Sequence, residues 1–354
     1  MDRAEETKLK VKMVRSLLEK TGHKGIIIRK QPNFSWVSAG GRGFIGLASE
    51  SACASIVISK TGIFIAGNNI ETPRLLAEEF PKGFAEPVIL PWAGDVGIDE
   101  LLNKKFGKLT NDTEQDAWFR ENRVNLLECE EIRYAKLGKI SAEILEDVCA
   151  SVKPGMSEFE IAGRISEGYW AAGIEPITLL IAADNRSDRV RHYVPTAKKI
   201  KNGVICSICA RSGGLVVSAT RSVGFSKDFA KRYEKLLKVE QAVLEATKGG
   251  AVLGNVYKTL TESYKQNGLD KEWENHHQGG LTGYLAREIR VLPETNFKVA
   301  PHQAYAWNPS AVGAKCEDTV LVGEKSQLSI LTKTGKNWPQ VKVGTLIRPG
   351  ILRK

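Results

Sequence analysis

The spacing of hydrophobic residues predicts alternating helices and strands over residues 1–125. Apolar side chains recur every three or four positions over residues 4–21, which is the period of an amphipathic helix. A Thr-Pro pair predicts a second helix over 72–80. Short runs rich in β-branched residues are typical of buried strands, and they occur at 25–28, 54–59, 62–66 and 87–90. This pattern predicts an α/β unit of ordinary domain size.

The second half begins with a longer helical pattern, over residues 128–152. Ser157 and Glu160 have the spacing of a capping box, so another helix is expected to begin there. Further helices are predicted at 227–247 and 252–267. The predicted strands of this half are 178–182, 203–210, 214–218, 304–307, 318–322 and 328–332. The fold class is therefore α/β (α+β), with two domains at residues 1–125 and 126–354.

The composition is that of a soluble globular protein. The chain has 354 residues, of which 42% are hydrophobic and 26% charged, which excludes a disordered or fibrous protein. The six cysteines are sparse, so we expect them to be reduced and the protein to be cytoplasmic. The first residues are charged rather than typical of a signal peptide, and no apolar run is long enough to predict a membrane span.

The chain is basic, with 51 Lys and Arg residues against 41 Asp and Glu residues, a net charge of +10. Much of this excess lies in residues 323–354, which we interpret as a solvated basic tail. Nucleic acid binding is not expected, because the strands lack the mixture of aromatic and basic residues found in RNA-binding sheets.

One candidate for acid–base chemistry is His192, in the loop at 184–196. The neighbouring Arg186, Arg189 and Arg191 are expected to lower the pKa of this histidine and favour neutral imidazole, the form that accepts a proton. The alternative is a solvated loop histidine with no chemical role.

A second candidate is the segment 275–288, where His276 and His277 precede Gly279 and Gly280. The imidazoles can supply acid–base or metal chemistry, and the glycines predict a close approach of the backbone to another group. The alternative is a glycine-rich turn with exposed histidines.

Polar residues also mark the last strands and the middle of the second half. Asn308 follows one predicted strand, and Glu317 and Asp318 begin the next, where carboxylates often act as ligands or bases. Cys206 and Cys209 form a CxxC pair, but positions three apart lie on opposite faces of a strand. We interpret both cysteines as core residues.

Taken in chain order, these stretches resemble the pita-bread family, peptidase family M24. That family contains methionine aminopeptidase, proline-specific aminopeptidases, prolidase and creatinase. The phrase RHYVPT resembles the family's histidine loop, SATR the end of its Asp-x-Thr-Arg strand, and CEDTVLV its final Glu-Asp-Thr strand. The resemblance implies a creatinase-like N-terminal α/β domain and a C-terminal pita-bread domain.

The resemblance also implies where metal ligands would lie. Peptidases of the family hold two metal ions with two Asp, one His and two Glu residues. The matching positions here are Ser207, Ser218, His277, Asn308 and Glu317. Three of these positions lack the carboxylate that divalent ions need, so we expect a divergent branch with no metal and no other cofactor. A divalent metal is expected only if this ligand argument fails.

Creatinase is the metal-free enzyme of the family, and its residues carry over in part. The loop histidine that acts on a guanidino C–N bond matches His192, and an arginine that binds the substrate carboxylate matches Arg287. The family's second histidine is replaced by Tyr284, and a creatinase Glu by Thr220, so creatine itself is not expected as the substrate.

The hypothesis from sequence is therefore a metal-independent hydrolase or lyase of a small, carboxylate-bearing nitrogen compound. The residues assigned to catalysis are His192, His277, Glu317 and Tyr284. The residues assigned to substrate binding are Arg287, Arg191, Glu288, His276, Asn308 and Arg42. Two alternatives stay open, an Xaa-Pro-type metallopeptidase with atypical ligands and a non-catalytic binding module.

The expected partners are a small molecule or short peptide and a second copy of the chain. The creatinase and prolidase groups form homodimers in which the N-terminal domain reaches the partner's site. By that resemblance, Trp36, Arg42 and the glycine-rich segment 38–44 are candidates for the contact.

Overall fold

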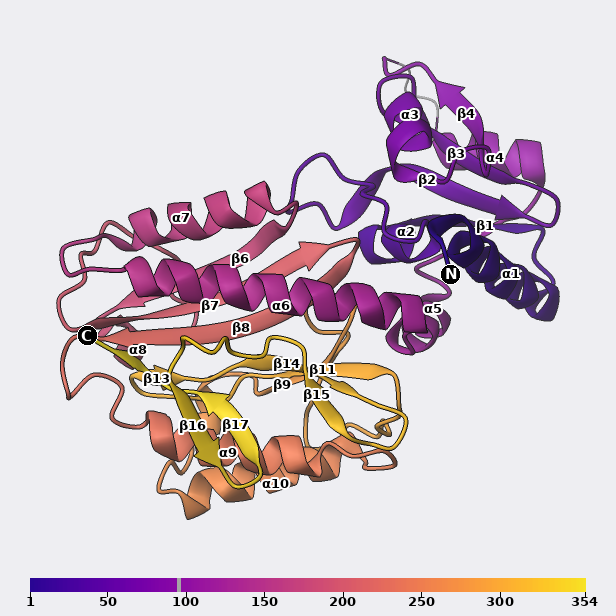
Figure 1. The fold of residues 1–354 in the computed structure, drawn as a ribbon. Coiled ribbons are helices and arrows are strands. Elements are labelled where there is room, and N and C mark those ends of the chain that lie inside the picture. Colours follow the sequence, from indigo (N-terminus) through magenta and orange to yellow (C-terminus); the bar gives the residue numbers. More distant parts are fainter. Residues whose placement is uncertain (94–96) are drawn as a thin grey trace. The chain divides into compact units, whose positions relative to one another are not determined.

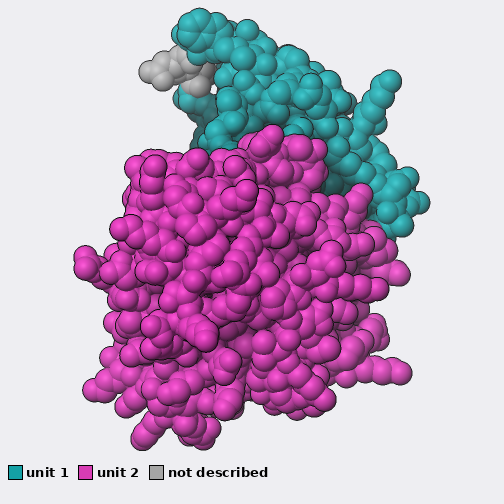
Figure 2. Space-filling model, turned by 60° about the vertical axis from the view of Figure 1, so that its left-hand side comes forward, with its two compact units in different colours: residues 1–123, 213–215 teal, residues 124–212, 216–354 magenta. Residues whose placement is uncertain are grey.

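The structure is a computed structural model that describes residues 1–93 and 97–354. Contacts within the chain divide it into two compact units, coloured separately in Figure 2. Unit 1 comprises Met1–Arg123 with Gly213–Leu215, and unit 2 comprises Val124–Ser212 with Val216–Lys354. That the two units are separate folding domains stays a prediction.

Unit 1 is built on a five-stranded mixed sheet in the order β4-β3-β2-β1-β5. Its strands are β1 (Gly25–Lys30), β2 (Ser51–Ser59), β3 (Ile63–Asn68), β4 (Glu86–Leu90) and β5 (Thr110–Asn111). Its helices are α1 (Arg3–Thr21), α2 (Gln31–Val37), α3 (Glu71–Arg74) with the π-helical turn η1 (Leu75–Glu79), α4 (Ile98–Phe106) and α5 (Asp116–Val124). β1, β2 and β3 pair antiparallel, whereas β4 and β5 add in parallel at the two edges.

Trp36 belongs to the core of unit 1 and not to its surface. Its ring is 1% exposed and packs edge-on against Trp118 and Phe119. The expectation that Trp36 contacts a partner subunit is therefore wrong. In the same segment, a side chain at Gly41 would meet the carbonyl oxygen of Glu79, so close packing within the unit requires that glycine.

Unit 2 contains two main sheets with helices packed against each of them (Figure 1). The first sheet has the order β18-β8-β7-β6 and the second has the order β10-β9-β11-β14-β15. The strands are β6 (Glu175–Ala183), β7 (Gly203–Ser212), β8 (Leu215–Gly224), β9 (Gly279–Thr282), β10 (Ile289–Arg290), β11 (Gln303–Trp307), β12 (Ser310–Ala311), β13 (Ala314–Lys315), β14 (Asp318–Val322), β15 (Leu328–Ile330), β16 (Gln340–Val343), β17 (Leu346–Pro349) and β18 (Leu352–Arg353). The helices are α6 (Glu128–Ser151), α7 (Glu158–Ala171), α8 (Arg186–Arg189), α9 (Tyr233–Ala246), α10 (Leu253–Gln266) and the 3-10 turn η2 (Glu272–Asn275).

The helices cover the sheets because each one presents an apolar face to them. α6 and α7 contact β7 and β6, and α9 and α10 pack together with α9 against β11 (Figure 1). The predicted capping box is present, since Ser157 accepts the backbone N–H of Glu160 and thereby fixes the start of α7. Among the helices of residues 1–93 and 97–354, none has the length and apolar character needed to cross a membrane.

The C-terminal residues do not form the solvated tail that their charge predicted. β16 and β17 pair as a hairpin, and β18 pairs in parallel with β8 at the edge of the first sheet. Within this segment Arg348 is fully buried, and the indole N–H of Trp338 donates to the carbonyl of Gly350 at 2.9 Å. Part of the basic excess therefore contributes to the core.

Arg348 belongs to a buried network of charges behind the second sheet. Its guanidinium lies 2.6 Å from a carboxylate oxygen of Glu240 and 2.7 Å from one of Asp318. The other Asp318 oxygen lies 3.1 Å from Arg221, which also pairs with Glu146 at 2.7 Å. A buried pair that loses one partner leaves an uncompensated charge, which is far more costly than losing an exposed pair.

We therefore expect Arg348→Met to lower the free energy of unfolding by about 3–5 kcal/mol, because Glu240 loses its cation. The matched control is Lys342→Met, an exposed lysine of the same hairpin, which should change stability by less than about 0.5 kcal/mol. Urea unfolding followed by circular dichroism compares the two variants. Equal, small losses would show that the C-terminal segment contributes little to stability.

Candidate functional site

The candidate site is a cavity of about 430 Å³ in unit 2. Segments far apart in the chain bring their side chains to it: strands β6 and β7, the loop after α8, the turn after η2, the β9–β10 connection with β10, and the segment from Asn308 through β13 to Glu317. Its polar lining residues are Thr178, His192, Ser207, Cys209, His276, His277, Arg287, Arg290, Asn308, Lys315 and Glu317. Six of the residues proposed from sequence therefore meet in one place: His192, His276, His277, Arg287, Asn308 and Glu317.

The three histidines form a cluster at this cavity. The rings of His276 and His277 stack with their centroids 4.4 Å apart, and the Nε2 atoms of His276 and His192 are 3.3 Å apart. His276 is 8% exposed, whereas His192 is exposed. Within the described part of the chain, the Nδ1 atoms of His276 and His277 are buried without a hydrogen-bond partner.

The environment of the cluster favours neutral imidazole. Burial, followed by the charge of Lys315, lowers the pKa of His276 to about 2. Burial and the charge of Arg287 lower the pKa of His277 to about 4. The pKa of His192 is also lowered, first by burial and then by Lys315 and Arg290. The predicted direction for His192 is confirmed, but Arg290 and Lys315 supply the charge, not the three arginines of its own loop.

Among the described residues, Glu317 is the one carboxylate that lines the cavity, and a cation lies beside each of its oxygens. The ammonium of Lys315 is 2.9 Å from Oε2, and the guanidinium of Arg287 is 2.8 Å from Oε1. All three side chains are at least nine-tenths buried. Burial alone would raise the pKa of Glu317, but the two cations outweigh it and the pKa is lowered, so the carboxylate is ionised at neutral pH.

The five positions matched to family metal ligands also meet here. Ser207, His277, Asn308 and Glu317 line the cavity, and the hydroxyl of Ser218 lies 3.4 Å from Arg287 Nη1. The serine hydroxyls hydrogen-bond to protein side chains, Ser207 to Thr220 at 2.8 Å and Ser218 to Cys209 at 3.3 Å.

Four residues assigned to the site are not among those lining the cavity. Tyr284 donates its hydroxyl to Glu130 at 2.5 Å, and Glu288 accepts the backbone N–H groups of Tyr284 and Leu285. These bonds fix the turn that carries Arg287. We therefore leave Tyr284 and Glu288 out of the reacting groups and treat them as positioning residues.

The two remaining arginines are held by carboxylates elsewhere. Arg191 pairs with Glu272 at 2.7 Å and so anchors the His192 loop. Arg42 belongs to unit 1, where its guanidinium lies 2.9 Å from Glu79. Its assignment to substrate binding stays a prediction.

Sequence reasoning missed Lys315 and Arg290, which line the cavity. Lys315 is two residues before Glu317, in β13, and that spacing on an extended chain was the available signal. Cys209 also lines the cavity, so of the CxxC pair Cys206 is the core residue and Cys209 is not. The glycine pair serves strand packing, because a side chain at Gly279 would meet the carbonyl oxygen of Ala306.

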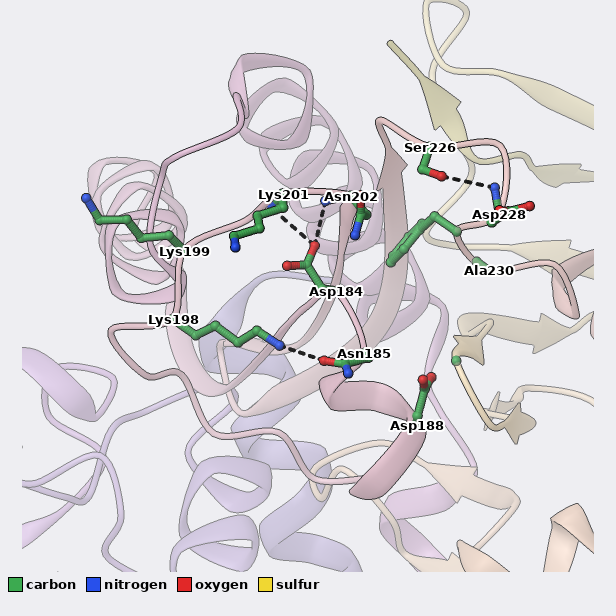
Figure 3. A pocket seen from close by; sticks show the side chains of 12 residues that line it. Asp184, Asn185, Asp188, Lys198, Lys199, Lys201, Asn202, Ser226, Asp228 and Ala230 are labelled. Atoms are coloured by element: carbon green, nitrogen blue, oxygen red, sulfur yellow. Dashed lines mark hydrogen bonds between the residues drawn. The ribbon is translucent and has the colours of Figure 1, made fainter.

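A second cavity, of about 790 Å³, lies beside the loop that follows His192 (Figure 3). Its lining includes three lysines and three aspartates, so its charges balance. Lys198 donates to the side chain of Asn185 at 2.9 Å, and the Asp184 carboxylate accepts backbone N–H groups of residues 201–203. Lys199 extends away from these groups (Figure 3). Among the described residues that line this cavity there is no histidine, and Asp184 and Lys198 bond within the loop itself.

Comparison with known proteins identifies the family. The family model described as metallopeptidase family M24 matches residues 132–324, more than half of the chain. The chain belongs to this family. Membership supports a hydrolase, and the sheets and helices of unit 2 form the family's pita-bread fold.

Solved structures of the same fold cover nearly the whole chain. The prolidase from Pyrococcus horikoshii OT3 is 20% identical, with a TM-score of 0.75 over 93% of this chain and 99% of that one. The Xaa-Pro dipeptidase from Bacillus anthracis is 16% identical, with a TM-score of 0.74 over 98% of this chain and 100% of that one.

One similar structure is a subunit of a larger complex. The N-terminal domain of the FACT complex subunit SPT16 from chickpea (Cicer arietinum) is 13% identical, with a TM-score of 0.69 over 94% of this chain and 97% of that one. A comparison with curated proteins found no match.

The family name implies a metal, and the residues of this cavity do not fit the family's pair of ions. Such ions need several anionic oxygens, whereas Glu317 is the one carboxylate in the cavity lining and both of its oxygens face cations. The three histidines have ligand atoms within 4.8 Å of one another, a spacing that could hold a single ion. However, the charges of Lys315 and Arg287 that disfavour imidazolium also repel a metal cation there.

We expect the purified protein to contain well below one equivalent of Mn, Fe, Co or Zn. Elemental analysis by mass spectrometry after dialysis measures this. Two equivalents of metal would contradict the expectation that these residues cannot hold the family's pair of ions. One equivalent that is lost in His276→Ala would place a single ion on the imidazoles.

The histidine environment predicts a specific titration. NMR of protein labelled with ¹⁵N-histidine should show His277 titrating with a midpoint near pH 4 and staying neutral above pH 6. The pKa is lowered, so the neutral ring is favoured and acid is needed to charge it. His302 is the internal control, because Glu131 raises the pKa of that ring. A midpoint for His277 near 6.5 would show that it is solvated and distant from the cations.

Proposed function

We propose that this protein hydrolyses a C–N bond in a small, carboxylate-bearing molecule, with His192 as the general base and without a pair of metal ions. One observation carries the proposal. Neutral imidazoles and a surplus of positive charge line one cavity, together with Ser207, Asn308 and Glu317 from the positions matched to the family's metal ligands.

The charges of the cavity support an anionic substrate. Its lining holds three cations, Arg287, Arg290 and Lys315, against the single carboxylate of Glu317. With neutral histidines the lining has two unbalanced positive charges, so an anion is attracted into it and a cation is repelled. Arginine can hold a carboxylate through two parallel hydrogen bonds, which suits Arg290 at the exposed edge of the cavity.

The histidine pair supports proton transfer. The Nε2 atoms of His192 and His276 are 3.3 Å apart, so one of the two carries the hydrogen that the other accepts. With His192 as the donor, its Nδ1 carries the lone pair and can accept a proton from water. The resulting hydroxide adds to the carbon of the C–N bond. His192 then returns the proton to the departing nitrogen, so that one water is consumed and the C–N bond is cleaved.

The candidate substrates are dipeptides first and amidino carboxylates second. Prolidase and Xaa-Pro dipeptidase share the fold over most of this chain, which supports a peptide C–N bond. The creatinase-like pattern of His192 and Arg287 supports the second class. We also propose a homodimer, as in the creatinase and prolidase groups that the chain resembles.

A non-catalytic binding module is the second candidate function. The similarity to the SPT16 domain favours it, since that protein is named as a complex subunit and not as a peptidase. The density of ionisable groups in the cavity weighs against it, because such clusters are found more often at sites of chemistry.

We expect His192→Ala to lower kcat by about 10²–10⁴-fold, the usual contribution of a positioned general base. The variant should fold normally, because the ring is exposed and little buried area is lost. The matched control is His302→Ala, a histidine of the same unit that is not in the cavity lining and pairs with Glu131. Mass spectrometry of products from a panel of dipeptides and amidino carboxylates, with and without chelator, measures the turnover.

The outcomes separate the candidate functions. Activity that resists chelator and depends on His192 supports the proposal. Activity that chelator abolishes would point to a metallopeptidase with atypical ligands. Activity unchanged in His192→Ala would exclude this residue as the base, and a wild-type protein inactive on the whole panel would favour the binding module.

A further inference from the structure

The ammonium of Lys315 is buried in the cavity with more hydrogen-bond donors than partners. The residue is 5% exposed, and Glu317, at 2.9 Å, is the one acceptor that it has among residues 1–93 and 97–354. An ammonium carries three N–H donors. Two of them are therefore available to a ligand in the cavity.

The charge balance around Lys315 is also incomplete. Arg287 already neutralises Glu317, at 2.8 Å from the other oxygen. The trio of Lys315, Arg287 and Glu317 is at least nine-tenths buried and carries one net positive charge. A buried charge without a counter-charge is costly, so the trio is complete only when an anion joins it.

Other polar atoms of the same cavity lack partners. Arg287 Nε is a buried donor and Asn308 Oδ1 is a buried acceptor, and neither is hydrogen-bonded within the part of the chain that the structure describes. A ligand with an anionic oxygen and a neighbouring N–H group would satisfy both. Asn308 is one of the positions matched to the family's metal ligands, and Arg287 pairs with another of them, Glu317.

We infer that Lys315 is the buried anion-binding residue of this cavity, deeper than Arg290 at its exposed edge, and takes over the positive charge that metal ions supply in related peptidases. The ligand is an oxyanion: a carboxylate, or the tetrahedral oxyanion that forms when water adds to a carbonyl. This inference deepens the proposed function and rests on it for the cavity being the substrate site.

The decisive variant is Lys315→Met, which is expected to fold because it removes an unbalanced buried charge. Removing the ammonium leaves Glu317 paired with Arg287 alone, so the buried charge becomes balanced. Methionine also fills a volume similar to that of the lysine stem. The melting temperature of this variant should therefore stay within about 2 °C of the wild-type value.

The experiment is titration calorimetry with inorganic phosphate and, separately, with acetate, at constant ionic strength. Lys315→Met should weaken binding by about tenfold or more, the usual effect of losing a hydrogen bond to a charged group. The matched control is Lys199→Met, an exposed lysine outside this cavity, which should bind as the wild type does. Tighter phosphate binding indicates a tetrahedral ligand, and tighter acetate binding a carboxylate.

A second variant tests the charge balance in the opposite sense. Glu317→Gln leaves two buried cations without a carboxylate, so it should melt roughly 5 °C or more below the wild type. Added phosphate should raise its melting temperature more than that of the wild type, because the anion replaces the lost charge. This measurement does not depend on the affinity of Lys315→Met.

Two results would overturn the inference: equal anion binding by the wild type and Lys315→Met, or no anion binding by the wild type. Neither measurement needs turnover. Anion binding without His192-dependent activity would leave Lys315 as an anion site and reject the hydrolase. His192-dependent activity without an effect of Lys315→Met on anion binding would support the hydrolase and reject Lys315 as the anion site.

Discussion

The carboxylate of Glu317 lies between an ammonium and a guanidinium, and the chemistry of the site depends on this contact. Each oxygen faces one cation, at 2.9 Å from Lys315 and 2.8 Å from Arg287. A carboxylate occupied in this way is a poor ligand for a divalent ion. Burial, and after it the same cations, lowers the pKa of His276 and His277, so the arrangement that disfavours a metal ion also favours neutral imidazoles.

Strand alternation separates this arrangement from a second one directly behind it. Glu317 faces the cavity, whereas the next residue, Asp318, lies between Arg221 and Arg348 in the core. The second network ties β14 to the C-terminal hairpin through Arg348. The two neighbouring carboxylates thus differ in surroundings, one at the cavity and one in a buried ion network, because the backbone directs them to opposite faces.

Much of the fold could be predicted from the sequence, since long periodic segments such as α1, α6 and α7 carry strong signals. Capping residues also fixed the start of α7 to within one residue of the expected position. Short elements were missed, α2 and α5 among them, because their side chains are explained by contacts that form only in the folded unit. The C-terminal hairpin was hidden by its charge, since nothing local indicates that Arg348 meets Glu240 across more than 100 residues.

The site could be predicted only in part, because some of its residues carry a local signal in the sequence and others do not. Histidines and a Glu-Asp pair are conspicuous in a sequence, and of these candidates three histidines and Glu317 meet in the cavity. Lys315 was not conspicuous, because a lysine is usually solvated and nothing local indicates that this one is buried beside Glu317. Tyr284 and Glu288 were assigned by analogy of position, whereas Tyr284 hydrogen-bonds to Glu130 of α6 and Glu288 to the backbone of the turn.

We propose that internal cations take the place of the metal ions that the family's peptidases hold. The most direct measurement is a crystal structure of protein grown with excess Mn²⁺, with data collected on both sides of the manganese absorption edge. We predict no anomalous peak among Ser207, Ser218 and Glu317, with Lys315 still beside the Glu317 carboxylate. A manganese peak bound by Glu317, with Lys315 displaced, would contradict the account.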